Sequence, residues 1–301
     1  MGRYEIEGKV VLITGAAKGI GRDTARRLAD RGAQLALVDL DSEGVERAAA
    51  EIGHGAEPFV ADVADRDSIA AAIGAARKRF GGIDVAMANA GISGTPQPST
   101  LVPDEEFERI IRINLLGVWW TLKHSMPDVI ERKGYLLGVA SLAAAVPTPL
   151  IAAYGASKAA VHSLGRTLRF ELAHTGAKAG TAYFAEIDTD MTRVAHKVPI
   201  IERTLKSVPE PLHRVQPVEV ASKAVVRGIE KRTTRITVPR WVNWTVTWNG
   251  LGRPFEALAA RDPRFVRNWK RAHVEAAQQG QALPDAAELP ETTEGEEVAS
   301  E

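Results

Sequence analysis

The chain has 301 residues, 45% of them hydrophobic, and its 38 lysines and arginines balance its 38 aspartates and glutamates. This length and composition suit one large α/β core with an appendage, and the balanced charge gives no general attraction to nucleic acid or acidic membranes. The absence of cysteine excludes disulfides, thiolate catalysis and cysteine-ligated zinc, and no metal site is predicted.

The N-terminal segment, MGRYEIEGKV, lacks the apolar core of a signal peptide, and Ile6 stands where a myristoylation motif requires serine or threonine. No run of about 20 apolar residues is present, so no transmembrane helix is predicted. Together with the lack of cysteine, these features lead us to expect a cytoplasmic protein.

The first predicted elements are a buried strand, Val10–Ile13, a glycine-rich turn and a helix. The glycines of the turn are Gly15, Gly19 and Gly21. Side chains at these positions would keep a pyrophosphate away from the N–H groups at the start of the helix. A second apolar run, Leu35–Val38, ends in Asp39, whose carboxylate can bind the 2′-hydroxyl of an adenosine ribose. The stretch therefore predicts a dinucleotide site.

Apolar runs and helix-length segments then alternate, which is typical of βα units that build a parallel sheet. Further strands are predicted at Pro58–Val63, Val85–Ala88, Tyr135–Ala140, Lys178–Phe184 and Ile236–Val238. Helices are predicted at Ser42–Ile52, Ser68–Phe80, Asp104–His124, Ile151–His174 and Val218–Lys231. We expect a doubly wound Rossmann fold with a seven-stranded parallel sheet in residues 1–239, with residues 190–214 as a lid over the substrate pocket.

Beyond Pro239 the composition changes, with a tryptophan-rich and basic extension at residues 240–280 and an acidic, disordered tail at residues 281–301. Within the extension, Trp241, Trp244 and Trp248 recur at helical spacing, with Leu251 continuing the stripe. We expect this apolar face to dock within the protein. Contact with a membrane surface, aided by the cations between residues 261 and 271, is the alternative.

Two residues of the predicted helix Ile151–His174, Tyr154 and Lys158, are four positions apart and share one helix face. An unperturbed phenol has a pKa near 10, and lowering it by about 3 units takes about 4 kcal/mol, which a neighbouring ammonium can help to supply. Ser141 follows a predicted strand, where its hydroxyl can bind a substrate oxygen. The tyrosine–lysine spacing alone is common in helices, so the functional interpretation depends on the other motifs.

Ordered motifs across residues 8–240 resemble the short-chain dehydrogenase/reductase family. They are Thr14-Gly15-Ala16-Ala17-Lys18-Gly19-Ile20-Gly21, Asp62-Val63, Asn89-Ala90-Gly91, Asn114 within Ile113–Gly117, Ser141, Tyr154-Gly155-Ala156-Ser157-Lys158 and Asp188-Thr189-Asp190-Met191. The resemblance implies that Tyr154 is the acid/base and that Ser141 orients the substrate oxygen. It implies that Lys158 lowers the pKa of Tyr154 and holds the nicotinamide ribose, and that Asn114 anchors a water linking Lys158 to solvent.

The resemblance also implies a set of cofactor contacts, in which Asp62 recognises adenine and Asn89 stabilises the central strand. The set is Gly15, Lys18, Gly19, Ile20, Gly21, Asp39, Asp62, Val63, Asn89, Ala90, Gly91, Tyr154, Lys158, Ile187 and Thr189. Asp39 favours NAD, because its charge would repel the 2′-phosphate of NADP. Lys18, a feature of some NADP-using relatives, keeps NADP as the alternative.

One departure concerns the segment after the sixth strand, where Phe184-Ala185 replaces the usual Pro-Gly and is followed by Glu186. Glu186 either faces solvent or sets substrate polarity. The expected function is NAD-dependent interconversion of a secondary alcohol and a ketone, with an apolar substrate. An NADP-dependent ketone reductase is the main alternative, and an epimerase or lyase is disfavoured, since its usual turn is Gly-x-x-Gly-x-x-Gly.

The same resemblance implies a homotetramer or homodimer, built on the predicted helices Asp104–His124 and Ile151–His174. Trp119, Trp120 and Phe170 could supply apolar contact area there, or could be core residues.

Overall fold

Seven parallel strands form one sheet in the order β3-β2-β1-β4-β5-β6-β7. The computed structural model describes residues 3–53, 55–199, 201–202 and 209–248, together with Arg267, Arg271 and Val274. The strands are β1 Val10–Thr14, β2 Gln34–Asp39, β3 Ala56–Val60, β4 Val85–Ala88, β5 Tyr135–Val139, β6 Lys178–Phe184 and β7 Arg235–Val238. The strand order reverses between β1 and β4, which confirms the predicted doubly wound Rossmann fold and marks the crevice for a ligand.

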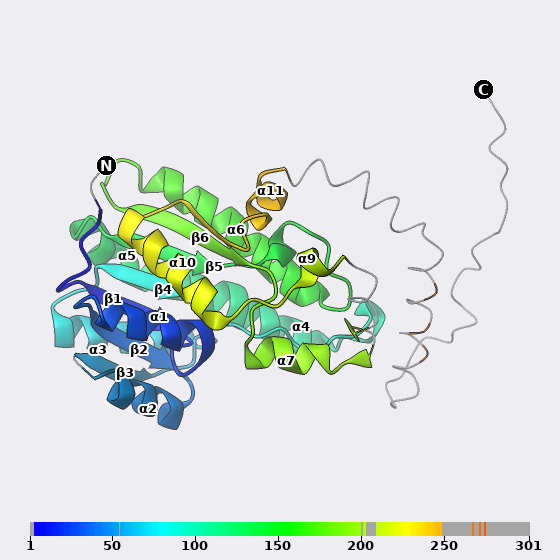
Figure 1. Ribbon diagram of the computed structural model, residues 1–301. Helices are drawn as coiled ribbons and strands as arrows, with labels where there is room; N and C mark the ends of the chain where they lie inside the picture. Colours follow the sequence, from blue (N-terminus) through cyan, green and yellow to red (C-terminus); the bar gives the residue numbers. More distant parts are fainter. Residues whose placement is uncertain are drawn as a thin grey trace.

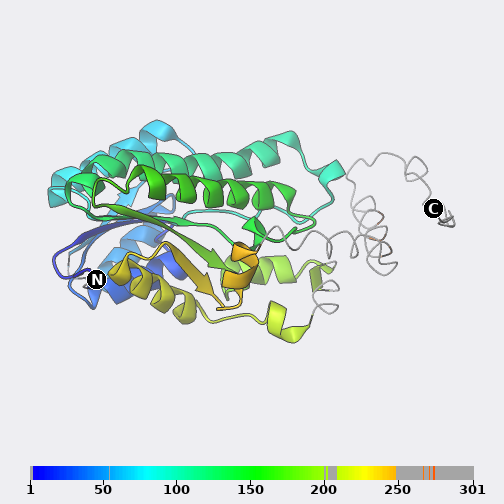
Figure 2. The same cartoon turned by 90° about the horizontal axis from the view of Figure 1, so that it is seen from above.

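Helices cover both faces of this sheet (Figures 1 and 2). One layer holds α1 Gly19–Ala29, α2 Ser42–Ile52 and α10 Val218–Lys231, and the other holds α3 Arg66–Phe80, α5 Gly117–Glu131 and α6 Ala152–Glu171. Alternate strand residues point to opposite faces, so Val11 and Ile13 pack with the first layer while Leu12 packs with the second. The near-continuous apolar strands follow from burial on both sides. Shorter helices are α4 Asp104–Ile111, α7 Asp190–His196, α9 Glu210–His213 and α11 Val242–Thr247.

The third strand ends earlier than predicted. It covers Ala56–Val60, whereas Pro58–Val63 was expected, so Asp62 lies in the turn after the strand. The backbone N–H of Asp62 donates to Ser68 Oγ (3.1 Å), and its Oδ1 accepts from the N–H of Ala64 (2.8 Å). These bonds bend the chain toward α3 and cannot coexist with a continued strand.

The predicted helix Asp104–His124 is longer and less regular than expected. It begins at Asp104, passes through a π-helical turn at Arg112–Leu116 and continues as α5 through Pro127 to Glu131. The end predicted at His124 is therefore wrong. Val129 is fully buried in the core, and the carboxylate of Asp128 accepts from Arg77 Nε (2.8 Å), so tertiary contacts hold the last turns in place.

Valines, rather than tryptophans, dock the helix of the C-terminal extension. In α11, Val242 is fully buried and Val246 is 5% exposed, whereas Trp244 and Trp248 are 67% and 53% exposed. Trp241, just before the helix, packs against the core. The predicted docked face of three tryptophans is therefore wrong, because the i, i+4 pair of compact valines faces the core and turns Trp244 and Trp248 outward.

Most of the predicted extension, including Leu251, residues 261–266 and residues 268–270, lies outside the described residues, as does the predicted tail at residues 281–301. Arg267, Arg271 and Val274 are described as exposed helical positions. Within the described part of the chain, no helix has the length and apolar character needed to cross a membrane.

The packing of α11 predicts that alanine substitutions at Val242 and Trp244 lower the free energy of unfolding by different amounts. Val242→Ala should lower the free energy of unfolding by about 1–3 kcal/mol, because it leaves a void in a buried site. Trp244→Ala should change it by less than about 0.5 kcal/mol, since the ring is largely in solvent. Urea unfolding of the two variants measures both values. Equal losses, or a larger loss at Trp244, would contradict the assigned face.

Candidate active site

The glycine-rich turn depends on backbones that approach more closely than a side chain would allow. A Cβ on Gly21 would lie 2.1 Å from the carbonyl oxygen of Gly15. The Asn89 carboxamide donates to the carbonyl oxygens of Thr14 (3.0 Å) and Gly15 (3.1 Å). In return, Thr14 Oγ1 accepts from the N–H groups of Asn89 (3.0 Å) and Ala90 (3.2 Å). These contacts lock the carboxyl ends of β1 and β4 together.

The N-terminus of α1 differs from those of its neighbours. Asp41 and Asp65 cap α2 and α3 with their side chains, whereas no side chain caps α1 and its first turn holds no acidic residue. Gly19 has a φ of +57°, and a Cβ there would meet only the Thr189 methyl group, at 3.6 Å. Uncapped N–H groups beside a glycine backbone fit a pyrophosphate.

Asp39, at the end of β2, is held beside this turn. Its Oδ2 accepts from the N–H of Ala17 (2.9 Å), and its Oδ1 accepts from the N–H of Asp41 (3.2 Å). The side chain is half-buried and still has lone pairs for a ribose hydroxyl. The residues present therefore fit the adenosine half of a dinucleotide.

The segment after β6 closes over the turn from the other side. Ile187 is buried and pairs with Gln216, and Thr189 caps α7. Lys18 Nζ lies 3.4 Å from Asp190 Oδ2, so an exposed ion pair links the glycine-rich turn to α7. Of the predicted lid, α7 and α9 are described and Val198 packs against Leu150, while Ile200 and residues 203–208 lie outside the described residues.

Asn114 occupies the π-helical turn, fully buried. Its Oδ1 accepts from the N–H of Ile92 (2.8 Å), and its Nδ2 donates to the Ile92 carbonyl (2.8 Å) and Ser157 Oγ (3.1 Å). A Cβ on Gly91 would lie 3.1 Å from Asn114 Oδ1 and 3.3 Å from Lys158 Nζ. The structure thus brings Asn114, Gly91 and Lys158 together, although Asn114 and Lys158 lie on different helices.

Lys158 is buried on α6. Its Nζ donates to the carbonyl of Val139 (3.0 Å) and lies 5.5 Å from the centroid of the Tyr154 ring. Burial lowers the pKa of Lys158 to about 8, because the apolar surroundings disfavour its charged form. The ammonium is therefore kept charged at pH 7 only against a desolvation penalty.

Ser141 lies two residues after the end of β5, within hydrogen-bonding reach of Tyr154. Its Oγ accepts from the N–H of Ala143 (3.2 Å), contacts the Phe184 carbonyl (3.4 Å) and forms a hydrogen bond with the Tyr154 side chain. Burial raises the pKa of Tyr154, the Ser141 bond lowers it, and the negative charge of Glu186 raises it further. The pKa lowering expected from Lys158 is not what this structure shows, because burial dominates.

Glu186 is the functional neighbour that sequence reasoning left open. Its side chain is 35% exposed, and Oε2 lies 3.1 Å from His196 Nε2 on α7. The signal was its replacement of an ordinarily apolar residue after β6. The structure adds that this carboxylate is close enough to act on Tyr154 and ties α7 to the site.

A shallow cavity of about 350 Å³ is lined by residues that follow Ser141 or flank Tyr154 in the sequence. The lining residues are small: Ala143, Ala144, Ala145, Val146, Pro147, Thr148, Ala152, Gly155 and Ala156. None of these side chains is charged.

Comparisons with known proteins agree with this arrangement. Residues 9–198 match the family model described as short chain dehydrogenase. The (-)-trans-carveol dehydrogenase of Rhodococcus erythropolis is 34% identical over 203 residues, covering 62% of this chain and 73% of that protein. Human 17-beta-hydroxysteroid dehydrogenase 13 is 30% identical over 253 residues, covering 80% and 78%.

Among solved structures, the 3-ketoacyl-(acyl-carrier-protein) reductase from Brucella melitensis complexed with NADH is similar, with a TM-score of 0.70 and 31% identity. The match covers 77% of this chain and 97% of that one.

The burial of Lys158 predicts a pH-dependent stability difference. Between pH 8 and 10.5 the folded state has lost a proton that the unfolded state still binds, so rising pH stabilises the folded protein by on the order of 3 kcal/mol. Lys158→Met removes this titration. The difference in free energy of unfolding between the wild type and this variant should therefore shift in favour of the wild type by on the order of 3 kcal/mol as the pH rises from 8 to 10.5.

Urea unfolding at both pH values measures the gain, and Lys123→Met, at an exposed position on α5, is the matched control. A constant difference between wild type and Lys158→Met would contradict the buried charge.

Proposed function

The chain belongs to the short-chain dehydrogenase family, and we propose that it is an NAD-dependent oxidoreductase that interconverts a secondary alcohol and a ketone. The observation that carries the proposal is the grouping of Ser141, Tyr154 and Lys158, with Asn114 behind them, beside the uncapped N-terminus of α1. A proton-transferring hydroxyl and a dinucleotide cradle are thus combined in one crevice.

Alcohol oxidation removes a hydride from carbon and a proton from oxygen. The nicotinamide, when bound, takes or returns the hydride. Tyr154 takes the proton in oxidation and gives it back in ketone reduction, and Ser141 donates a hydrogen bond that orients the substrate oxygen. Lys158 holds the nicotinamide ribose and bears a positive charge that favours the phenolate.

The raised pKa of Tyr154 affects ketone reduction and alcohol oxidation differently. A protonated phenol is ready to donate to a ketone at neutral pH, whereas oxidation requires the phenolate. Lys158 Nζ lies 5.5 Å from the centroid of the ring, and a positive charge at this position favours the phenolate. Asn114 and Ser157 support Lys158 by joining α6 to the end of β4.

The choice of NAD rests on Asp39. Its carboxylate, fixed by the N–H groups of Ala17 and Asp41, accepts hydrogen bonds from a ribose diol and repels a 2′-phosphate. Lys18, which keeps NADP as the alternative, pairs with Asp190 on the lid side of the turn. The similar reductase from Brucella melitensis was solved with NADH, which supports the same cofactor here.

For the substrate, we propose an apolar, ring-containing secondary alcohol or the matching ketone. The names of the similar carveol and hydroxysteroid dehydrogenases support this class, and the cavity lined by sequence neighbours of Ser141 and Tyr154 carries no charged side chain.

The assembly we propose is a homo-oligomer, a tetramer or a dimer, built on α4–α5 and α6. Phe170 on α6 is 70% exposed and Phe107 on α4 is 40% exposed, which leaves apolar surface on these helices for a second copy. Trp120 packs against the core, so it contributes less contact area than Phe170.

Light scattering at micromolar concentration should give a multiple of the chain mass, and a monomer would contradict the assembly.

The central test of the mechanism is Tyr154→Phe. The variant should lose at least about 1,000-fold in turnover of alicyclic alcohols, because it keeps the ring but lacks the proton that the reaction moves. NADH binding, followed by fluorescence, should stay within about threefold of the wild type. Tyr4→Phe is the matched control, since the Tyr4 hydroxyl has no hydrogen-bond partner within the described residues. Turnover of Tyr154→Phe within tenfold of the wild type would overturn the mechanism.

The cofactor proposal is tested by Asp39→Asn, which keeps an oxygen for the Ala17 N–H but removes the charge. The ratio of kcat/KM for NAD to that for NADP should fall about tenfold or more, since about 1.4 kcal/mol of repulsion corresponds to a factor of ten. Asp62→Asn should leave this ratio unchanged, because Asp62 is expected on the adenine side. A wild-type preference for NADP would show that the Asp39 argument is wrong.

A further inference from the structure

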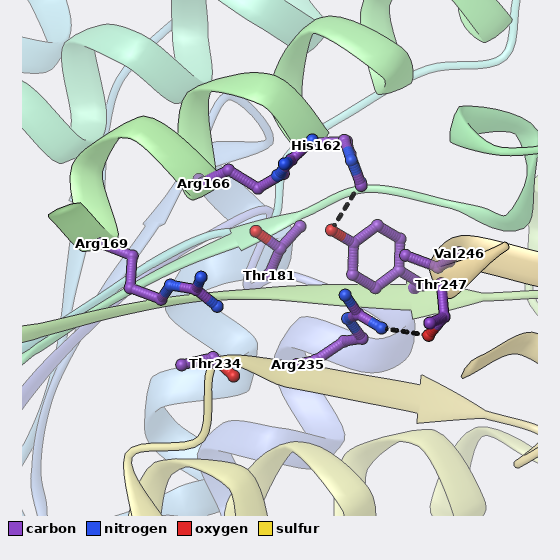
Figure 3. Close-up of a pocket in the computed structure, with 10 residues that line it drawn as sticks. His162, Arg166, Arg169, Thr181, Thr234, Arg235, Val246 and Thr247 are labelled. Carbon is purple, nitrogen blue, oxygen red and sulfur yellow. Dashed lines mark hydrogen bonds between the residues drawn. The ribbon is translucent and has the colours of Figure 1, made fainter. Parts of the chain in front are cut away.

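A second cavity, of about 200 Å³, lies apart from the active site, between α6 and α11 and over β6 and β7 (Figure 3). It shares α6 with the catalytic residues but uses the later turns of that helix. Arg166, on its rim, follows Tyr154 by three turns, which corresponds to about 18 Å along the helix axis. Nothing in the proposed dehydrogenase chemistry uses this cavity.

Three guanidinium groups surround it: those of Arg166 and Arg169 on α6 and of Arg235 on β7. None of the residues that line the cavity carries a carboxylate. Arg235 Nη1 donates to the Thr247 hydroxyl (2.6 Å), and the Arg169 guanidinium lies 5.2 Å from the Phe170 ring, so neither charge is neutralised by these contacts. By contrast, several arginines elsewhere in the described chain, such as Arg77, are paired with carboxylates.

The floor of the cavity is polar and rigid. Thr181 and Tyr183 of β6 are each 2% exposed, and the Tyr183 hydroxyl lies 2.9 Å from His162 Nδ1. A Cβ on Gly165 would come within 2.0 Å of the Thr181 hydroxyl, so glycine at this position is what allows α6 to pack against this part of the floor. Hydroxyl and imidazole groups are therefore held next to the guanidinium groups.

The charges around the cavity act on the pKa values of two residues that line it, His162 and Tyr183. Burial lowers the pKa of His162, and the charges of Arg166 and Arg235 lower it further. Burial raises the pKa of Tyr183, while Arg235, Arg166 and Arg169 all act to lower it. Three guanidinium groups without a carboxylate among the lining residues, two of them on the exposed rim at Arg166 and Arg169, leave a positive potential that attracts an anion.

We propose that this cavity binds an oxyanion of the phosphate class, free or as a phosphate ester, held by the guanidinium groups of Arg166, Arg169 and Arg235. Guanidinium groups match phosphate oxygens in geometry and form strong charge-assisted hydrogen bonds with them. The ester could belong to a soluble metabolite or to a lipid headgroup. The exposed Trp244 and Trp248 on α11, the helix that closes one side of the cavity, make the lipid source testable.

The test is calorimetric titration of the full chain with inorganic phosphate and with glycerol 3-phosphate, each in the presence and absence of saturating NADH. NADH blocks the glycine-rich turn, so binding that persists in its presence belongs elsewhere. The double variant Arg166→Gln/Arg169→Gln should weaken this binding at least about tenfold, because it removes two charge-assisted contacts. Arg47→Gln is the matched control, since Arg47 is an exposed arginine on α2, and binding should stay within about twofold.

Co-sedimentation distinguishes the two sources. If a lipid headgroup is the ligand, vesicles of phosphatidic acid and phosphatidylcholine should bind the wild type, and both the double arginine variant and Trp244→Ala/Trp248→Ala should reduce that binding. If the ligand is soluble, phosphate or its ester binds and the vesicles do not. The proposal is overturned if neither probe binds at millimolar concentration, or if binding is insensitive to the arginine variants.

A change of oligomeric mass in the double variant, without phosphate binding by the wild type, would also overturn the proposal, because it would assign the groove to a contact between copies. Far-ultraviolet circular dichroism confirms that each variant is folded, and Arg166→Glu provides an independent single change that should abolish binding.

Discussion

The close approach of Gly15, Gly21 and Asn89 is the contact on which the remaining site depends. No side chain fits between the Gly15 carbonyl and Gly21, and the Asn89 carboxamide ties the ends of β1 and β4 to the same carbonyls. This contact sets where α1 begins, and therefore where its uncapped N–H groups point. It also places Gly91, two residues after Asn89, against Lys158. The proposed cofactor site and the proposed catalytic group are thus positioned by one junction at the switch point of the sheet.

The burial of Lys158 lowers the stability of the folded protein at neutral pH. A buried ammonium with a single carbonyl acceptor within the described residues is unfavourable at neutral pH, which is why its pKa falls to about 8. Burial also raises the pKa of Tyr154. Asn114 joins α6 to the loop after β4 through Ser157 and Ile92, next to the buried lysine. Two titratable groups with pKa values shifted by burial, one helical turn apart, are more typical of a functional site than of simple packing.

Sequence reasoning predicted the positions of side chains best where these positions depend on residues that are neighbours along the chain. The glycine-rich turn, Asp39 at a strand end and the Tyr154–Lys158 spacing are local patterns with a direct geometric meaning. The π-helical turn around Asn114 has no such pattern, because it depends on how two helices meet the loop at Ile92. The orientation of α11 could not be predicted either, because its valines and tryptophans both recur at helical spacing. Only the packing against the core shows that the valines face inward and that Trp244 and Trp248 face outward.

Sequence reasoning missed the arginine-lined cavity because the cavity depends on tertiary packing. The geometry of α6 explains how the cavity and the candidate active site can share one helix. Tyr154, Lys158, His162, Arg166 and Arg169 follow one another at steps of three or four, so they form a single stripe along the helix. In its N-terminal half this stripe meets the end of β5, where Lys158 donates to the Val139 carbonyl. In its C-terminal half it lies over β6 and β7, where α11 supplies the opposite wall. One helix face therefore carries two polar centres, because its successive turns lie over different strands of the sheet.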